Sequence, residues 1–212
     1  MIKELFDADG KVVGFLDKGG RLIALGVLWL LGSLPIITIV PSTAALYYAV
    51  IKSIRRGQGS AFQEFRRSFR DNLLRGIPLS LTAVGLGAVL NLNLKILQGQ
   101  SHRLLVWGTW ILLCLILFSC VYVGPILSRF RLKYVDVWKL AFLMSLRHIH
   151  YTLLILVGAA AIMALQFYFL PIPTILILPG VCCYVATFPI EKALRCYMPE
   201  KKENDNAWYY ET

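Results

Sequence analysis

The chain has 212 residues, and 58% of them are hydrophobic, with a mean hydropathy of +0.65. This apolar fraction lies above the range of soluble domains and indicates an integral membrane protein. The formal net charge is +10, but the basic residues flank apolar runs and do not form one face of a folded module, which argues against nucleic-acid binding. The length suits a single membrane domain over residues 1–212 and leaves no room for a separate catalytic domain.

The distribution of basic residues along the sequence predicts the membrane topology. Of the 22 Lys and Arg residues, 20 fall in four segments: residues 1–21, 52–76, 128–150 and 191–212. Five apolar runs lie between these segments, one in the first interval and two in each of the others: residues 22–51, 77–94, 104–127, 151–170 and 172–190. Runs of this length can cross a bilayer, and basic segments concentrate on its cytoplasmic side. The sequence therefore predicts an all-α polytopic transmembrane helix bundle of five to six spans in the plasma membrane. Both tails would be cytoplasmic, and anionic lipid would be the partner of the basic segments.

The first apolar region, residues 22–56, is interrupted by proline. Pro35 and Pro41 disfavour a continuous helix, and Ser42 and Thr43 are typical of a helix start, where hydroxyl groups cap free amides. A hairpin turn near these prolines keeps the basic segments on its two sides in the same compartment. Each arm holds about 13 apolar residues, or roughly 20 Å of helix at 1.5 Å per residue. We expect two short or tilted spans, with a re-entrant hairpin as the alternative.

The next segment, residues 57–76, predicts a basic amphipathic helix. Apolar side chains recur at steps of three and four, and arginines fall between them. The apolar positions are Phe62, Phe65, Phe69 and Leu73, and the basic positions are Arg66, Arg67 and Arg70. Such a helix is suited to lie at the cytoplasmic interface as an anchor. The alternative is that its phenylalanines and arginines form a docking surface for a cytoplasmic loop of a partner.

The remaining segments form two predicted span pairs, residues 77–127 and 151–190, on either side of a second basic amphipathic segment, residues 128–150. Its histidines, His148 and His150, are two residues apart and face different sides of a helix, so they make a poor metal pair. The best candidates for lining a polar path through the bundle are Asn91, Asn93 and Gln166.

No acidic residue lies at the centre of any predicted span. Ion-coupled transporters normally need an ionisable group inside the membrane. The nearest acid, Glu191, lies at the cytoplasmic end of the last span beside Lys192 and Arg195. We expect an interfacial ion pair or a helix-end contact there, not an ion-coupling residue.

Signatures of catalysis and cofactor binding are absent from the sequence. It has no glycine-rich phosphate loop, no His-Glu-x-x-His pattern and no Gly-x-Ser-x-Gly pattern. Four of the five cysteines lie inside apolar runs, and no Cys-x-x-Cys spacing occurs. The sequence therefore predicts a protein that is not an enzyme and that needs no cofactor and no metal.

The order of landmarks resembles the YesL family, bacterial membrane proteins of unknown function. The most specific match is residues 33–48, SLPIITIVPSTAALYY, in which Val40 stands where Gly is expected. The other matches are FD at 6–7, LWLL at 28–31, the Phe/Arg loop at 62–69, RH at 147–148 and FPIEK at 188–192. The resemblance covers most of the chain and carries over no catalytic or ligand residue. It implies a role in sugar uptake, since members resemble components found near carbohydrate ABC transporters in Gram-positive bacteria.

Two functions from different classes remain open. The first is a non-catalytic accessory or regulatory component that assembles with a carbohydrate ABC permease. The second is a small autonomous transporter or channel for an uncharged solute, which would act as a homo-oligomer because six thin spans enclose little space. The lack of central charge favours the first, although a neutral sugar can cross without any charge.

Overall fold

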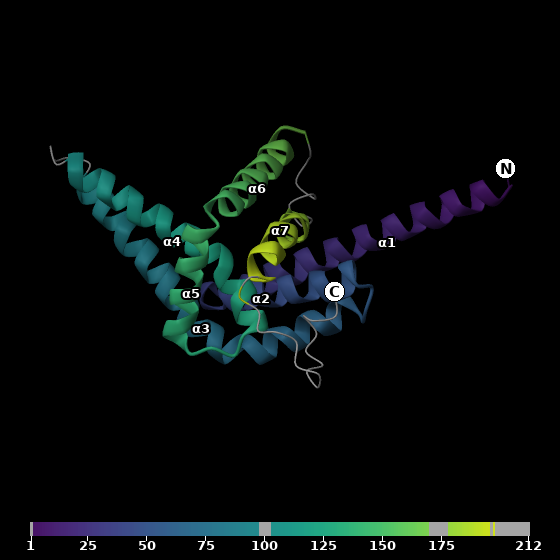
Figure 1. Ribbon diagram of the computed structural model, residues 1–212, viewed down its shortest axis with the longest axis horizontal. Coiled ribbons are helices and arrows are strands. Elements are labelled where there is room, and N and C mark those ends of the chain that lie inside the picture. The colour runs from purple at the N-terminus through teal and green to yellow at the C-terminus, as the bar shows by residue number, and fades with distance from the viewer. Residues whose placement is uncertain (1, 98–102, 170–177, 196, 198–212) are drawn as a thin grey trace.

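The computed structural model describes the backbone of residues 2–97, 103–169, 178–195 and 197. Side chains are described for residues 17–97, 104–165, 178–194 and 197. Within these ranges the regular structure is entirely helical, with no strand (Figure 1). The helices are α1 (Ile2–Ser33), the 3₁₀ turn η1 (Ile36–Thr38), α2 (Ile39–Ala49), the π-helix η2 (Val50–Arg55), α3 (Ala61–Leu97), α4 (Arg103–Arg129), α5 (Tyr134–Arg147), α6 (Ile149–Phe169) and α7 (Leu178–Arg195).

Three helical segments of the described part are long and apolar enough to cross a membrane. They are Ile36–Arg55, Ala61–Leu97 and Leu104–Arg129. Helices α5 and α6 meet at 90° and make a fourth candidate if the bent pair is one span. The chain thus carries apolar helices suited to a membrane protein. The last expected run, residues 172–190, lies partly outside the described residues, as do residues 196 and 198–212 of the expected C-terminal tail.

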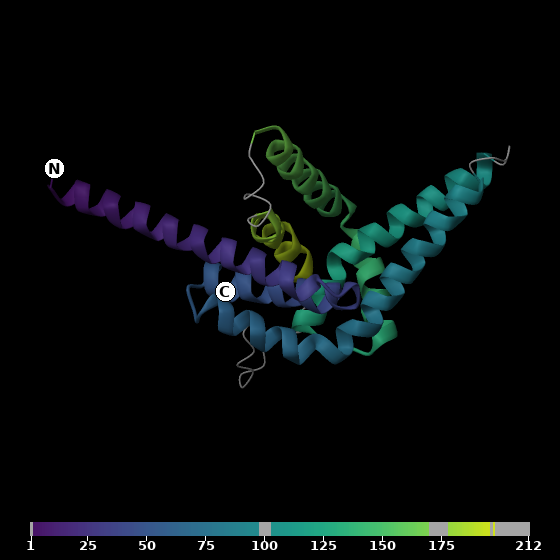
Figure 2. The ribbon, with the colours of Figure 1, turned by 180° about the vertical axis from the view of Figure 1, so that it is seen from behind.

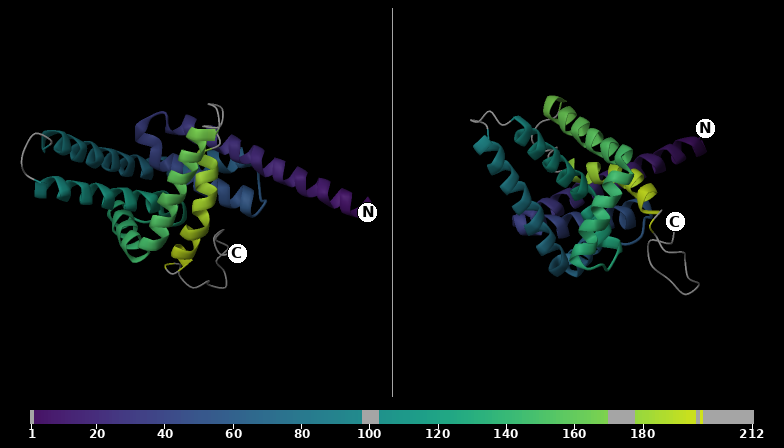
Figure 3. Two further views of the ribbon diagram at one scale, coloured as in Figure 1. Left: turned by 90° about the horizontal axis from the view of Figure 1, so that it is seen from above. Right: turned by 60° about the vertical axis from the view of Figure 1, so that its left-hand side comes forward.

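Helix α2 is the central element of the body and contacts α1, α3, α4 and α7 (Figure 1). Helices α3 and α4 lie side by side and extend from the body as a long arm (Figures 1 and 2). Helix α1 projects in another direction toward the N-terminus (Figure 2). Helices α6 and α7 pack against each other (Figure 3).

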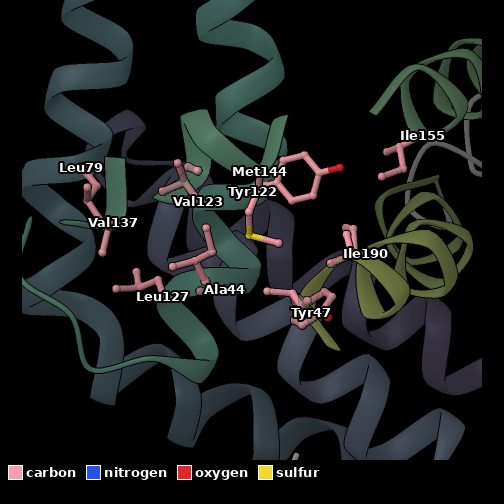
Figure 4. Packing of buried hydrophobic residues seen from close by; sticks show 14 of the residues in the cluster. Ala44, Tyr47, Leu79, Tyr122, Val123, Leu127, Val137, Met144, Ile155 and Ile190 are labelled. Carbon is pink, nitrogen blue, oxygen red and sulfur yellow. The ribbon is translucent and has the colours of Figure 1, made fainter. Parts of the chain in front are cut away.

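The central position of α2 follows from its composition, because the helix has no polar face and a helix that is apolar all round is buried. Two buried clusters lie against it. One joins Ala44 and Tyr47 to residues of α4, α5 and α7, among them Tyr122, Met144 and Ile190 (Figure 4). The other joins residues of α1, α2, η2 and α3 and includes Leu25, Ala45, Val50 and Phe65.

The turn between α1 and α2 is closed by hydroxyl groups. Helix α1 ends at Ser33, Pro35 is extended with φ −74° and ψ 114°, and α2 begins at Ile39. The hydroxyl of Thr38 lies 2.7 Å from both the Pro35 and the Gly32 carbonyl oxygens, so it can donate to either. The position of Pro41 differs from the expectation, because it lies inside α2, in its first turn.

Ser42 and Thr43 do not cap the start of α2 but join the two arms of the hairpin. The Ser42 hydroxyl donates to the Trp29 carbonyl at 3.1 Å, and the Trp29 indole donates to the Thr43 hydroxyl at 3.2 Å. A backbone amide at the start of α2, that of Val40, instead donates to the hydroxyl of Ser80 on α3 at 3.0 Å. One of the free amide donors at this helix start is therefore satisfied by a neighbouring helix.

The expected amphipathic helix and the following span form one helix, α3, of 37 residues. Pro78 lies inside it and removes one backbone hydrogen bond, which permits a bend without ending the helix. Figure 1 shows α3 following the body before it turns into the arm. The basic segment and the α3 part of the arm therefore belong to one helix.

Gly76 permits the close crossing of α3 and α2. A Cβ atom at this position would lie 2.6 Å from Cδ of Pro41, whose ring cannot rotate away. We expect Gly76→Ala to lower the free energy of unfolding by about 1–3 kcal/mol through overpacking. The measurement is the thermal unfolding midpoint in mild detergent.

Gly85 offers a control for this substitution, because a Cβ atom there would have nothing within 4 Å. Gly85→Ala should leave the unfolding midpoint unchanged or raise it, since Ala is the better helix former by about 0.5–1 kcal/mol. Equal effects of both substitutions would contradict the crossing as the cause.

Candidate functional site

A buried ion cluster joins the end of α4 to α7 and η2. Arg129 ends α4, and its guanidinium donates to the carboxylate of Glu191 on α7; both side chains are buried. The other carboxylate oxygen of Glu191 lies 3.7 Å from a guanidinium nitrogen of Arg55. Arg129 also lies over the ring of Tyr47 at 5.7 Å, and Arg55 lies over the ring of Phe188 at 4.7 Å. Such contacts stabilise a cation held away from water.

A cavity of about 680 Å³ opens beside this cluster, between α3 and the end of α4. Arg67, Asp71 and Arg75 line it from α3, and Arg129 and Arg131 line it from the end of α4 and the turn that follows. Four of the lining residues are arginines and one is acidic. The cavity therefore brings together the two internal basic segments, which lie more than fifty residues apart in the sequence.

The neutral polar groups of the cavity are held by bonds to their own helices. Asn72 donates through Nδ2 to the Ser68 carbonyl at 2.9 Å and lies 3.2 Å from its hydroxyl. Ser128 donates to the Pro125 carbonyl at 2.8 Å. Tyr48, which also lines the cavity, accepts a hydrogen bond from the Lys52 ammonium at 3.2 Å. The Lys52 ammonium also forms an ion pair with Glu64 at 2.9 Å. Glu64 does not line the cavity, and Asp71 is the one acidic residue that does.

The comparisons with known proteins agree with the landmarks found in the sequence. Residues 22–94 match a family described as "Protein of unknown function, DUF624". The uncharacterized protein YesL of Bacillus subtilis (strain 168) is 29% identical over 151 residues, which make up 68% of this chain and 71% of that protein. Over these residues the chain is similar to the YesL family. No solved structure matches it.

The region matched to the family includes α2 and the part of α3 that lines the cavity. Arg67, Asp71 and Arg75 lie within residues 22–94, whereas Arg129, Arg131 and Glu191 lie beyond them. The cavity therefore combines residues inside and outside the matched region of the YesL family.

Some side chains of the predicted docking surface, residues 62–70, are exposed, and others are buried inside the protein. Phe62 is exposed, as are the three arginines, Arg66, Arg67 and Arg70. Phe65 is buried in the cluster around α2, and Phe69 stacks on it with ring centroids 6.1 Å apart. Of the three arginines, only Arg67 lines the cavity.

Two of the three candidates for a polar path, Asn91 and Asn93, are described, and both lie on the outside of α3. Asn91 and Asn93 are exposed, and each donates to a carbonyl of its own helix, that of Gly87 at 2.8 Å and that of Val89 at 3.1 Å. The side chain of Gln166 lies outside the described residues. Among the described residues, no group of three or more His, Cys, Asp and Glu could hold a metal ion.

Sequence reasoning missed two features of this site. It expected an ion pair or a helix-end contact for Glu191 beside Lys192 and Arg195, but did not identify Arg129 and Arg55, which come from earlier helices, as ion-pair partners. It also treated Arg67, Arg75 and Arg131 as parts of two separate charged segments. The only available signal was that each segment carries arginine at the border of an apolar run, which does not reveal which borders meet.

Proposed function

We propose that this protein is a non-catalytic integral membrane protein that acts as an accessory or regulatory component of carbohydrate ABC-type uptake. In this proposal it has five to six spans in the plasma membrane and both termini in the cytoplasm. The meeting of segments 52–76 and 128–150 at one cavity supports a common side for the basic segments. The link to carbohydrate uptake rests on the family resemblance and is part of the proposal.

The observation that carries the accessory role is the open surface of the α3–α4 arm. In an apolar 18-residue window of α3 and of α4, only 17% and 6% of the residues, respectively, are buried inside the chain. A Cβ atom added at Gly85 on α3 or at Gly108 on α4 would have nothing within 4 Å. Glycine inside a helix costs about 0.5–1 kcal/mol relative to alanine. Small residues are common where another membrane helix packs closely, so these positions support contact with a partner helix.

The experiment is in-cell crosslinking in native membranes, purification in mild detergent and identification of the proteins recovered. We expect a sugar permease at near-stoichiometric yield. Gly85→Leu and Gly108→Leu should lower its recovery about tenfold, because a bulky side chain overpacks a close helix contact.

Gly19→Leu is the matched control, since Gly19 on α1 also has open space around it but lies outside the arm. It should leave the recovery unchanged. Recovery of this protein alone would contradict the accessory role and favour a homo-oligomeric transporter, which a solute-flux assay in liposomes would then test.

A further inference from the structure

The cavity between α3 and α4 is lined in part by arginines that form no hydrogen bond or ion pair with other described residues. Among the described residues, Arg67, Arg75 and Arg131 form no hydrogen bond or ion pair, and all three are exposed. Arg129, in contrast, is committed to Glu191. The three guanidinium groups and Asp71 leave two positive charges in excess in the cavity.

The spacing of these charged residues along α3 places their side chains on the side of the helix that lines the cavity. Arg67, Asp71 and Arg75 follow one another at intervals of four, so they lie on one face of α3. Arg131 reaches the same cavity from the turn after α4. On α3, Arg67 and Arg75 line the cavity, whereas Arg66 and Arg70 do not. The positive charge of the cavity is therefore distinct from the general surface charge of the helix.

We propose that this cavity binds a phosphate monoester. At neutral pH such a group carries a charge of about −1.5 to −2, which matches the excess in the cavity. The planar guanidinium fork suits phosphate oxygens, which it binds through two parallel hydrogen bonds. The volume of about 680 Å³ suits a small ligand, because such pockets measure about 300–1,000 Å³.

The phosphate monoester has two sources, a lipid headgroup and a soluble metabolite. Arg75 comes just before the apolar part of α3, and Arg129 ends the candidate span of α4, so the cavity lies at the border of the apolar arm. A phosphatidic acid headgroup could enter from the membrane, and a soluble monoester from the aqueous side. The chemistry of recognition is the same for both.

The test uses the full chain and two probes with the same headgroup. Calorimetric titration of the protein in mild detergent measures binding of glycerol 3-phosphate. Native mass spectrometry after release from phosphatidylcholine nanodiscs that contain phosphatidic acid measures binding of the lipid. We expect saturable binding of at least one probe, and binding of the lipid alone assigns the site to the membrane headgroup.

Variants of α3 decide whether the cavity is the site. Arg67→Gln and Arg75→Gln should each weaken binding about tenfold, since each removes a charge-assisted hydrogen bond. Asp71→Asn should strengthen binding, because it removes the repulsive carboxylate. Arg70→Gln is the matched control and should change the affinity less than about twofold, as an exposed charge outside the cavity is screened by salt. Absence of binding of both probes, or equal loss in Arg70→Gln and Arg67→Gln, would overturn the proposal.

Discussion

Glu191→Gln is expected to lower the free energy of unfolding by about 3–5 kcal/mol, because it leaves the buried charge of Arg129 without its counter-charge. The substitution keeps the size of the side chain, so the loss reports on charge. Arg55 cannot compensate, since it is itself a cation that contacts the same carboxylate. The measurement is the unfolding midpoint followed by tryptophan fluorescence in mild detergent.

Two further variants separate this pairing from other effects. Lys192→Gln changes the exposed neighbour of Glu191 and should have an effect of no more than about 0.5 kcal/mol. Arg129→Met combined with Glu191→Leu should regain most of the loss, because apolar residues of similar volume can replace a buried ion pair. A double variant as unstable as Glu191→Gln would contradict the unpaired charge as the cause.

Phe65→Ala is expected to lower the free energy of unfolding by about 3–5 kcal/mol through the cavity that it leaves. Phe65 is only 5% exposed and belongs to the buried cluster that joins α1, α2, η2 and α3. Its stacking partner Phe69 would lose one side of its contact as well. The unfolding midpoint measures this loss, and protease sensitivity of the α2–α3 connection gives an independent readout.

Phe62→Ala is the matched control, because Phe62 lies three residues away on the same helix and is 53% exposed. Its stability effect should stay within about 0.5 kcal/mol. If this position contacts a partner, Phe62→Ala should lower recovery of the partner while the unfolding midpoint stays the same. A large loss of stability in Phe62→Ala would contradict the description of Phe62 as exposed and Phe65 as buried.

The two proposals concern different surfaces of the chain and can fail independently. The accessory role depends on the apolar arm of α3 and α4, where glycines are open to a neighbouring helix. The phosphate site depends on arginines at the base of that arm. Because α3 is continuous from the cavity to the arm, one helix connects both surfaces.

Several features of this protein could be predicted from the sequence because they depend on local composition. The apolar runs and the basic segments between them indicated a helical membrane protein, and the stretch around Pro35–Pro41 indicated the YesL family. The break between α1 and α2 contains Pro35, whereas Pro41 lies inside α2. Backbone hydrogen bonding in an apolar setting leaves few alternatives to helix, so residue type and run length suffice for such predictions.

The sequence by itself determined the helical class, the apolar helices and the similarity to the YesL family, whereas the tertiary structure decided which faces meet. Periodicity placed Phe62, Phe65 and Phe69 on one stripe, but only the packing of α3 on α2 buries Phe65 and leaves Phe62 exposed. The pairing of Arg129 with Glu191 spans 62 residues, and the cavity joins two distant arginine segments. Spacing along a helix shows which side chains share a face. What that face contacts depends on how separate helices pack, and that is settled by the whole chain.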